Sequence, residues 1–272
     1  MKLTYYGTAA YEAIPALYCS CAICEHARKM GGKEIRSRHL TTVDQDIQFD
    51  LSPDFFYHTT LGFEPRAIRH MIITHAHSDH FVPDSLNTRI HPYALTEVSP
   101  CQLICNQKTA KQADAVLETT YEKLHLIKLE IAPYSPITLD EQTTLTALPA
   151  HHAPNDGGGY IYLLTRNGRT LLYAHDTGIP ADEVFDYLAG KKVHAASLDC
   201  TGAYLGAGEH HMDISSCEQV VNRLGKKAVL AKDAAIILNH FSHGGGATQT
   251  QLEEEAKKRG WVAAYDGMTV NV

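Results

Sequence analysis

The chain has 272 residues, of which 44% are hydrophobic and 20% charged, the composition of an ordinary globular protein. Its formal net charge of −7 would repel a long polyanion such as RNA, and the lysine pairs at 191–192 and 226–227 are too isolated to form a basic patch. No apolar run could span a membrane, and the opening MKLTYYGTAAYEA has no features of a secretory signal, so we expect a cytoplasmic protein without membrane or long nucleic-acid partners.

Hydrophobic patterning predicts alternating strands and helices, with no linker rich in proline or serine and no internal repeat. Strands are expected at 2–6, 46–51, 70–74, 102–105, 125–131, 143–150, 159–165, 170–176, 194–200 and 234–241, with a final strand pair within 261–272. Helices are expected at 21–32, 108–124, 180–190, 215–225 and 248–260. This order predicts a single layered α/β domain over residues 1–272, with helices outside and sheets inside.

Three histidines and an aspartate are crowded into HAHSDH, directly after the buried strand expected at 70–74. His75 and His77 are two residues apart, so an extended loop points both the same way and lets them hold one metal ion. Asp79 and His80 follow after the chain turns and can serve a second ion nearby. Imidazole and carboxylate groups suit zinc, manganese, iron(II) or nickel, but this loop has too few ligands for two ions.

Later strands also end in residues of the ligand type, and strand ends at one edge of a sheet can form a common site. His152 is expected to complete the first ion's ligands and His240 the second's, while the two oxygens of Asp176 can bridge both ions. The neighbouring histidines at 151 and 152 compete for one role, and only one of them should be a ligand. The strand-end residues of this kind are His75, His151, His152, His175, Asp176, Asp199 and His240.

The order HxHxDH, a lone histidine, a strand-end aspartate and a second lone histidine resembles the metallo-β-lactamase superfamily. The resemblance extends from GTAA after the first strand to YDGM near the end. It implies an αββα four-layer sandwich and a dinuclear site for two divalent ions, zinc or manganese, with iron or nickel as alternatives. In this family the lone histidine lies three residues after a proline, a pattern that Pro149 and His152 match, and His151 stays open as the alternative.

A second cluster of metal-type ligands lies in LYCSCAICEH, where Cys19, Cys21 and Cys24 have CxCxxC spacing. In a cytoplasmic protein such a cluster indicates metal or redox chemistry rather than a disulfide framework. Three thiolates need a fourth ligand for tetrahedral zinc. His26 is nearest in the sequence, whereas His243, in NHFSH, can turn away from the catalytic ions while staying close to them.

One subgroup of the superfamily combines an N-terminal CxCxxC with a late HxxH. It includes the phosphoribosyl cyclic phosphodiesterases of the carbon–phosphorus lyase pathway, and a similar cysteine cluster occurs in the pyrroloquinoline-quinone biosynthesis B proteins. The resemblance implies one structural zinc that clips the loop at about 15–32 to the loop after the last catalytic strand. Its implied ligands are Cys19, Cys21, Cys24 and His243.

Two ions that share a hydroxide lower its pKa and offset charge on a phosphoryl or carbonyl oxygen, but the leaving group still needs a proton. GEHHMD, residues 208–213, lies in a glycine-bearing loop, a suitable place for a mobile acid. A catalytic histidine in a His-x-Asp stretch of the cyclic phosphodiesterases is matched by His211, with His210 as its competitor. His211 and Asp79 are therefore the catalytic candidates. Asp50 and Asp54 are candidates for orienting the ligand histidines, with ordinary turn and helix-cap roles as the alternative.

The sequence thus predicts a metal-dependent hydrolase, most simply a phosphodiesterase that uses a metal-bridging hydroxide on a small anionic substrate such as a cyclic phosphodiester. An acyl or lactam hydrolase of the lactonase, thioesterase or β-lactamase type is the first alternative, since the same metals serve that chemistry. A non-hydrolytic accessory protein resembling the quinone-cofactor B proteins is the second. The net charge disfavours transfer-RNA 3′ processing. The native substrate, the metal identity and the oligomeric state, including a homodimer, stay open.

Overall fold

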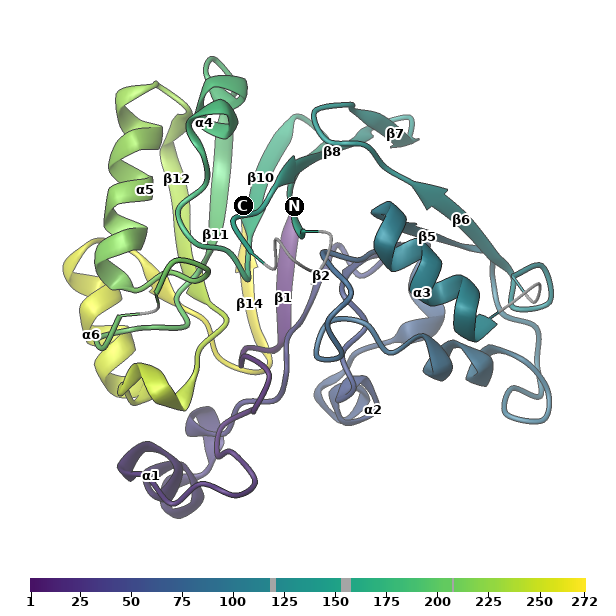
Figure 1. Ribbon diagram of the computed structural model, residues 1–272, viewed down its shortest axis with the longest axis horizontal. Helices are drawn as coiled ribbons and strands as arrows, with labels where there is room; N and C mark the ends of the chain where they lie inside the picture. The colour runs from purple at the N-terminus through teal and green to yellow at the C-terminus, as the bar shows by residue number, and fades with distance from the viewer. Residues whose placement is uncertain (118–120, 153–157, 207) are drawn as a thin grey trace.

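A computed structural model describes residues 1–117, 121–152, 158–206 and 208–272. In these residues the strands form two seven-stranded sheets that face each other (Figure 1). The strand order of the first sheet is β14 (Met268–Asn271), β1 (Lys2–Gly7), β2 (Leu40–Val43), β3 (Ile47–Phe49), β4 (His70–Ile72), β5 (Cys101–Cys105) and β6 (Leu126–Glu130). That of the second is β13 (Val262–Ala263), β12 (Leu230–Asn239), β11 (Val193–Asp199), β10 (Arg169–Ala174), β9 (Tyr160–Arg166), β8 (Thr143–Pro149) and β7 (Ile137–Asp140).

Each sheet is half parallel and half antiparallel. β3 to β6 pair in parallel, as do β10 to β13, whereas the strands toward β14 in one sheet and β7 in the other pair antiparallel. β4 and β11, which lie inside the parallel halves, are buried along their whole length, as strands covered on both faces are. Asn167 and Gly168 connect β9 to β10 with positive φ angles of 52° and 73°, as a two-residue type I′ hairpin turn requires.

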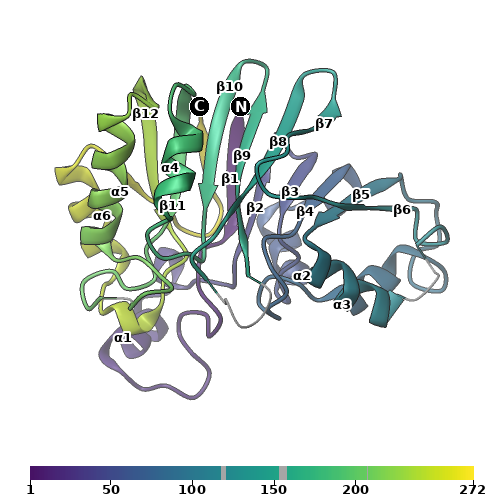
Figure 2. The ribbon, with the colours of Figure 1, turned by 45° about the horizontal axis from the view of Figure 1, so that its top comes forward.

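Helices cover the outer face of each sheet (Figures 1 and 2). α4, α5 and α6 lie on the second sheet, α2 and α3 lie on the first, and α1 lies with its loop at one end of the sandwich. The helices are α1 (Ala22–Met30), α2 (Phe55–His58), α3 (Gln107–Leu117), α4 (Asp182–Leu188), α5 (Ile214–Lys226) and α6 (Gln249–Lys258). Short 3₁₀ segments are η1 (Gly32–Glu34), η2 (Thr59–Leu61), η3 (Pro65–Ala67), η4 (Pro83–Arg89) and η6 (His243–Gly245).

Three apolar layers hold this arrangement together. The middle layer joins the two sheets, where the Phe49 and Tyr173 rings stack with centroids 3.9 Å apart. The second layer packs α4, α5 and α6 against one sheet, and the third packs α3 and η4 against the other. Two sheets between two helical layers form the four-layer αββα sandwich, so the predicted fold class is confirmed.

The C-terminal segment differs from the expected strand pair. β13 extends the edge of the second sheet, whereas β14 pairs with β1 at the edge of the first sheet. Asp266, between them, accepts hydrogen bonds from the Thr8 hydroxyl and from the Ser37 backbone and hydroxyl, which anchors the crossing segment. The expectation of one pair was wrong because two short strands near in sequence can each find a partner in a different sheet.

Two further strands, β2 and β7, were not expected from the hydrophobic pattern. β2 has the sequence LTTV, in which two threonines interrupt the apolar pattern although all four residues are buried. No helix in the described parts of the chain combines the length and the apolarity that crossing a bilayer requires.

Candidate metal centre

The HAHSDH loop follows β4, a short strand buried in the middle of the parallel half of its sheet. The backbone N–H groups of His80 and Phe81 both donate to the His77 carbonyl, so the loop turns tightly after His77. This turn separates the first two histidines of the loop from Asp79 and His80, as the spacing predicts.

The loop meets three residues from the second sheet. His152 follows β8, Asp176 follows β10 and His240 follows β12, each at the carboxyl end of its strand. In two groups of four residues, one candidate ligand atom from each residue lies within 4.8 Å of the others. The groups are His75, His77, His152 and Asp176, and Asp79, His80, Asp176 and His240.

Asp176 belongs to both groups and lies between them. Its Oδ2 atom is 3.2 Å from the Nε2 atom of His75 and 3.2 Å from that of His80, while its Oδ1 atom is 3.3 Å from the Nδ1 atom of His152. Burial opposes ionisation of this carboxyl, but the surrounding imidazoles, His240 foremost, outweigh burial and hold its pKa well below the usual range. A buried carboxylate whose Oδ2 atom lies beside a histidine of each group is suited to bridging two cations.

The hydrogen bonding of the buried polar atoms shows whether the site fits cations. Among the described residues, the Nε2 atom of His75 and the Oδ1 atom of Asp176 are buried without a hydrogen bond of good geometry. Such atoms are costly unless another partner satisfies them. Burial also lowers the pKa of His75, and lowers that of His152 to about 4, which keeps both imidazoles neutral as metal ligands must be.

His80 is the exception among the imidazoles. Burial alone would lower its pKa, but the carboxylates of Asp79 and Asp50 outweigh burial and raise it well above the usual value. Burial would raise the pKa of Asp79, yet His80 beside it holds that pKa well below the usual range. This end of the site therefore attracts positive charge, which a divalent cation supplies in place of the proton. Neutral imidazoles with carboxylates fit zinc, manganese, iron(II) or nickel.

Hydrogen bonds behind the ligands fix their orientation. The Nδ1–H group of His80 donates to Asp50 at 2.8 Å, and Asp50 also accepts from the backbone and hydroxyl of Thr74. The Thr201 hydroxyl lies 2.9 Å from the Nδ1 atom of His240. In both histidines the Nε2 atom is thus left to face the metal group. The expectation for Asp54 was wrong, because Asp54 makes a two-point ion pair with Arg38 instead of contacting a ligand.

Three site residues have left-handed backbone conformations. The φ angles of Asp50, Asp176 and His240 are 66°, 52° and 60°, values that favour glycine over residues with side chains. Each residue lies where a strand ends, and the sharp turn directs its side chain across the end of the sheet. Backbone strain of this kind concentrates at functional sites.

His211 lies beside the bridging carboxylate. Its Nδ1 atom is 3.0 Å from the Oδ1 atom of Asp176 and 3.3 Å from the Oδ2 atom of Asp199. Burial opposes the charged imidazole, but the two carboxylates outweigh burial and raise the pKa of His211 to about 10. The ring of the competitor His210 lies edge-on to that of His151, with centroids 5.6 Å apart, and 6.3 Å from that of His152. Neither His210 nor His151 belongs to a ligand group in the described part of the chain.

Asp199 and His175, which the sequence places at strand ends without assigning them to an ion, are buried beside the candidate ligands. The Oδ2 atom of Asp199 lies 3.4 Å from the Nδ1 atom of His240, and its Oδ1 atom accepts from the Met212 backbone, which anchors the loop of His211. Its position at the end of β11 was the available signal. His175 packs below the site against the Ser197 hydroxyl at 2.7 Å, in a place that only the tertiary structure defines.

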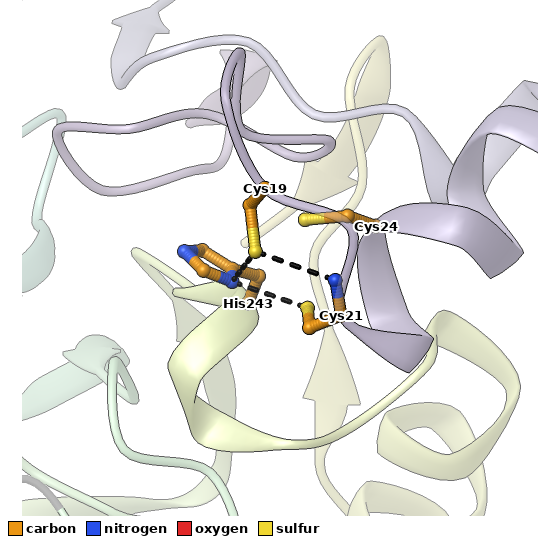
Figure 3. Close-up of side chains that lie close together, drawn as sticks. All are labelled: Cys19, Cys21, Cys24 and His243. Atoms are coloured by element: carbon orange, nitrogen blue, oxygen red, sulfur yellow. Dashed lines mark hydrogen bonds between the residues drawn. The ribbon is translucent and has the colours of Figure 1, made fainter.

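The cysteine cluster lies at the start of α1 and meets η6 (Figure 3). The Nδ1 atom of His243 is 3.6 Å from the sulfur of Cys19 and 3.4 Å from that of Cys21, and one ligand atom from each of the three cysteines and His243 lies within 4.8 Å of the others. The backbone N–H of Cys24 lowers the pKa of the Cys21 thiol to about 6, as the beginning of a helix does for thiolates. His26 instead lies 3.4 Å from Glu34. Three thiols and one imidazole form a donor set that fits tetrahedral zinc.

The two metal groups open into a pocket of about 290 Å³. A second pocket of about 600 Å³ lies next to it and shares Tyr11 and Glu12 as lining residues. The first pocket is lined by Ala10, Tyr11, Glu12, His77, Asp79, His152, Asp176, Thr201, His211, His240 and Ser242.

Residues 45–232 match the family model described as the Beta-lactamase superfamily domain. The match covers most of the chain and includes the HAHSDH loop, His152 and Asp176, so the protein belongs to the metallo-β-lactamase superfamily, whose members are mostly metal-dependent hydrolases. It ends before His240 and begins after the cysteine cluster. No curated protein sequence matches the chain.

Solved structures share the fold over nearly the whole chain. A diphosphatase of the PhnP family is 20% identical, with a TM-score of 0.73 over 99% of this chain and 96% of its own. Zn²⁺-bound PqqB from Methylobacterium extorquens is 16% identical, with a TM-score of 0.71 over 100% of both chains. The short form of human tRNase Z is 15% identical, with a TM-score of 0.67 over 100% of this chain and 99% of its own. At these identities the likeness is one of fold.

Proposed function

We propose that the protein is a metal-dependent phosphodiesterase that hydrolyses a small phosphodiester, with cyclic phosphodiesters as the preferred class. The observation that carries the proposal is the position of Asp176, which lies between two ligand groups and also contacts the histidine suited to protonate a leaving group. The first group contains His75 and His152, and the second contains Asp79 and His240. When bound, two divalent ions supply a hydroxide nucleophile at neutral pH and offset charge on the phosphoryl oxygens.

His211 supplies the remaining proton. Because the carboxylates of Asp176 and Asp199 both face its Nδ1 atom, the proton for the leaving group is carried on Nε2. The two carboxylates also keep the imidazole charged and oriented. The side chain is 28% exposed and lines the metal pocket, so it can reach an oxygen that leaves a phosphorus atom bound there.

The size and charge of the protein support a small substrate. A pocket of about 290 Å³ suits a single nucleotide or sugar phosphate. The net charge of −7 gives no long-range attraction for a folded RNA, which supports a small substrate over a transfer RNA.

Turnover of bis(p-nitrophenyl) phosphate by the manganese-loaded protein tests the proposal. We expect saturable release of p-nitrophenol that a chelator abolishes and added manganese restores. A metal-loaded protein that hydrolyses no phosphodiester but cleaves a lactone or thioester would instead be an acyl hydrolase. A loaded protein inactive on both classes would favour an accessory role in cofactor biosynthesis.

Elemental analysis should find three metal ions per chain, two at the histidine and aspartate groups and one zinc at the cysteine cluster. Mild chelation should remove the first two before the thiolate-bound zinc, because thiolates bind zinc more tightly than carboxylates do. A stoichiometry of one ion per chain in fully active protein would contradict the dinuclear site.

Replacing His211 by alanine should lower kcat by about 10²–10⁴-fold, the usual contribution of a general acid. The metal content should stay the same, since no ligand is lost from either of the two groups that hold the proposed ions. His210→Ala is the matched control and should keep nearly wild-type kcat. Equal losses in both variants would remove His211 from the mechanism.

A further inference from the structure

Glu12 lies between the two candidate metal centres, on a segment that leads from β1 to the cysteine cluster. The backbone of this segment is fixed on both sides of Glu12. Ala10 donates its N–H group to the Phe241 carbonyl at 2.9 Å, and Ile14 donates to the Arg36 carbonyl at 2.9 Å. The carboxylate therefore projects from a well-held loop, beside the residues that follow β12.

Both partners of this carboxylate come from the segment that connects the two centres. The Ser242 hydroxyl donates to the Oε1 atom of Glu12, and the Nε2 atom of His243 lies 3.6 Å from the same oxygen. The other ring nitrogen of His243, Nδ1, faces the thiols of the cysteine cluster. The imidazole is thus placed with one nitrogen toward the thiols and the other toward a carboxylate.

The 3.6 Å contact is longer than a hydrogen bond, but a carboxylate at this distance electrostatically favours the tautomer of His243 with its proton on Nε2. That tautomer leaves Nδ1 free to bind a cation, as in sites where a carboxylate orients a metal-binding histidine. Glu12 also lines both the metal pocket and the larger pocket beside it. A single side chain therefore contacts a ligand of the cysteine centre and forms part of the wall of the substrate pocket.

We propose that Glu12 is a positioning residue that couples the cysteine–histidine centre to the substrate pocket. Glu12 orients His243 toward the thiols. In turn, His243 and Ser242 hold Glu12 in the wall of the pocket. The proposal concerns the structural centre directly. Its effect on the substrate rests on the proposed phosphodiesterase function.

Cobalt(II) bound by thiolates gives a ligand-to-metal charge-transfer absorption, which reports on the cysteine centre alone because the other candidate groups among the described residues contain no sulfur. Titrating metal-free protein with cobalt, we expect Glu12→Gln to weaken binding at this centre by about 10–100-fold. Glu25→Gln is the control, since it removes the same charge next to Cys24 from a side chain paired with Arg28. It should leave the titration unchanged.

With zinc in the centre and manganese in the active site, Glu12→Gln should raise KM for bis(p-nitrophenyl) phosphate more than it lowers kcat. Glu25→Gln should change neither. An unaltered cobalt titration in folded Glu12→Gln protein, with folding checked by circular dichroism, would overturn the orientation of His243. Weakened cobalt binding with an unchanged KM would overturn the coupling to the pocket. If the wild-type protein has no phosphodiesterase activity, the proposed function is refuted, but the cobalt titration still tests the role of Glu12 at the cysteine centre. Ser242→Ala is a further comparison because it keeps the contact between Glu12 and His243. This variant should bind cobalt more tightly than Glu12→Gln does.

Discussion

Asp79→Ala is expected to lower phosphodiesterase kcat by on the order of 10³-fold or more, because one group loses its own carboxylate ligand while the other keeps all four residues. Asp79 is buried and belongs only to the group of His80 and His240. The variant therefore tests whether the second ion is needed for turnover. Steady-state kinetics with bis(p-nitrophenyl) phosphate should show the loss of activity. Metal analysis should show the loss of one ion per chain.

The control for this variant is Asp84→Ala, five residues further along the chain, where the aspartate is exposed at the start of η4. It should retain wild-type kinetics and metal content. Far-ultraviolet circular dichroism of Asp79→Ala should show the wild-type fold, although loss of the buried Asp79–His80 pair should lower its melting temperature without metal; this separates catalysis from folding. Full activity in Asp79→Ala would refute the two-ion scheme.

Cys21→Ser should destabilise the zinc-loaded protein by about 2–4 kcal/mol, the effect of losing a cross-link between distant segments. At about 2–4 °C for each kcal/mol in a chain of this size, the melting temperature should fall by roughly 4–16 °C. The physical reason is that residues 15–32 hold little apolar core of their own, since only Ala16, Cys24 and Ala27 among them are buried hydrophobic residues.

Differential scanning calorimetry before and after zinc removal distinguishes this effect from a packing defect. The wild type and Cys21→Ser should have the same melting temperature once zinc has been removed from both. kcat of the manganese-loaded active site should change much less than the melting temperature. A zinc-loaded variant that melts with the wild type would contradict a structural role for the cluster.

The convergence of the candidate ligands could be predicted from the sequence because several of them come just after strands with an obvious apolar pattern, whereas their role as ligands stays a prediction. His75, Asp176 and His240 have this signal in full, and the distance between ligands along the chain is irrelevant once strand ends meet. The fold class followed from the same pattern and from family resemblance. The cysteine cluster was visible because its spacing is short.

The supporting residues could not be predicted in the same way. Thr201 forms a hydrogen bond with His240 and Asp199 lies 3.4 Å from it, and both contacts depend on how β11 lies beside β12. Glu12 is 230 residues from Ser242 in the sequence, and nothing in its local pattern distinguishes it from a surface glutamate. The partners of β13 and β14 likewise depend on which sheet edge is free after the rest of the chain has folded.

The division of the metal ligands between the two sheets has a mechanical consequence. The HAHSDH loop belongs to one sheet, and His152, Asp176 and His240 belong to the other, so cations held among them cross-link the halves of the sandwich at one rim. Their binding free energy then resists separation of the sheets at that rim, whereas the apolar layer resists it elsewhere. Loss of the cations would first increase amide hydrogen exchange at the carboxyl ends of β4, β10 and β12, and would leave the opposite rim protected.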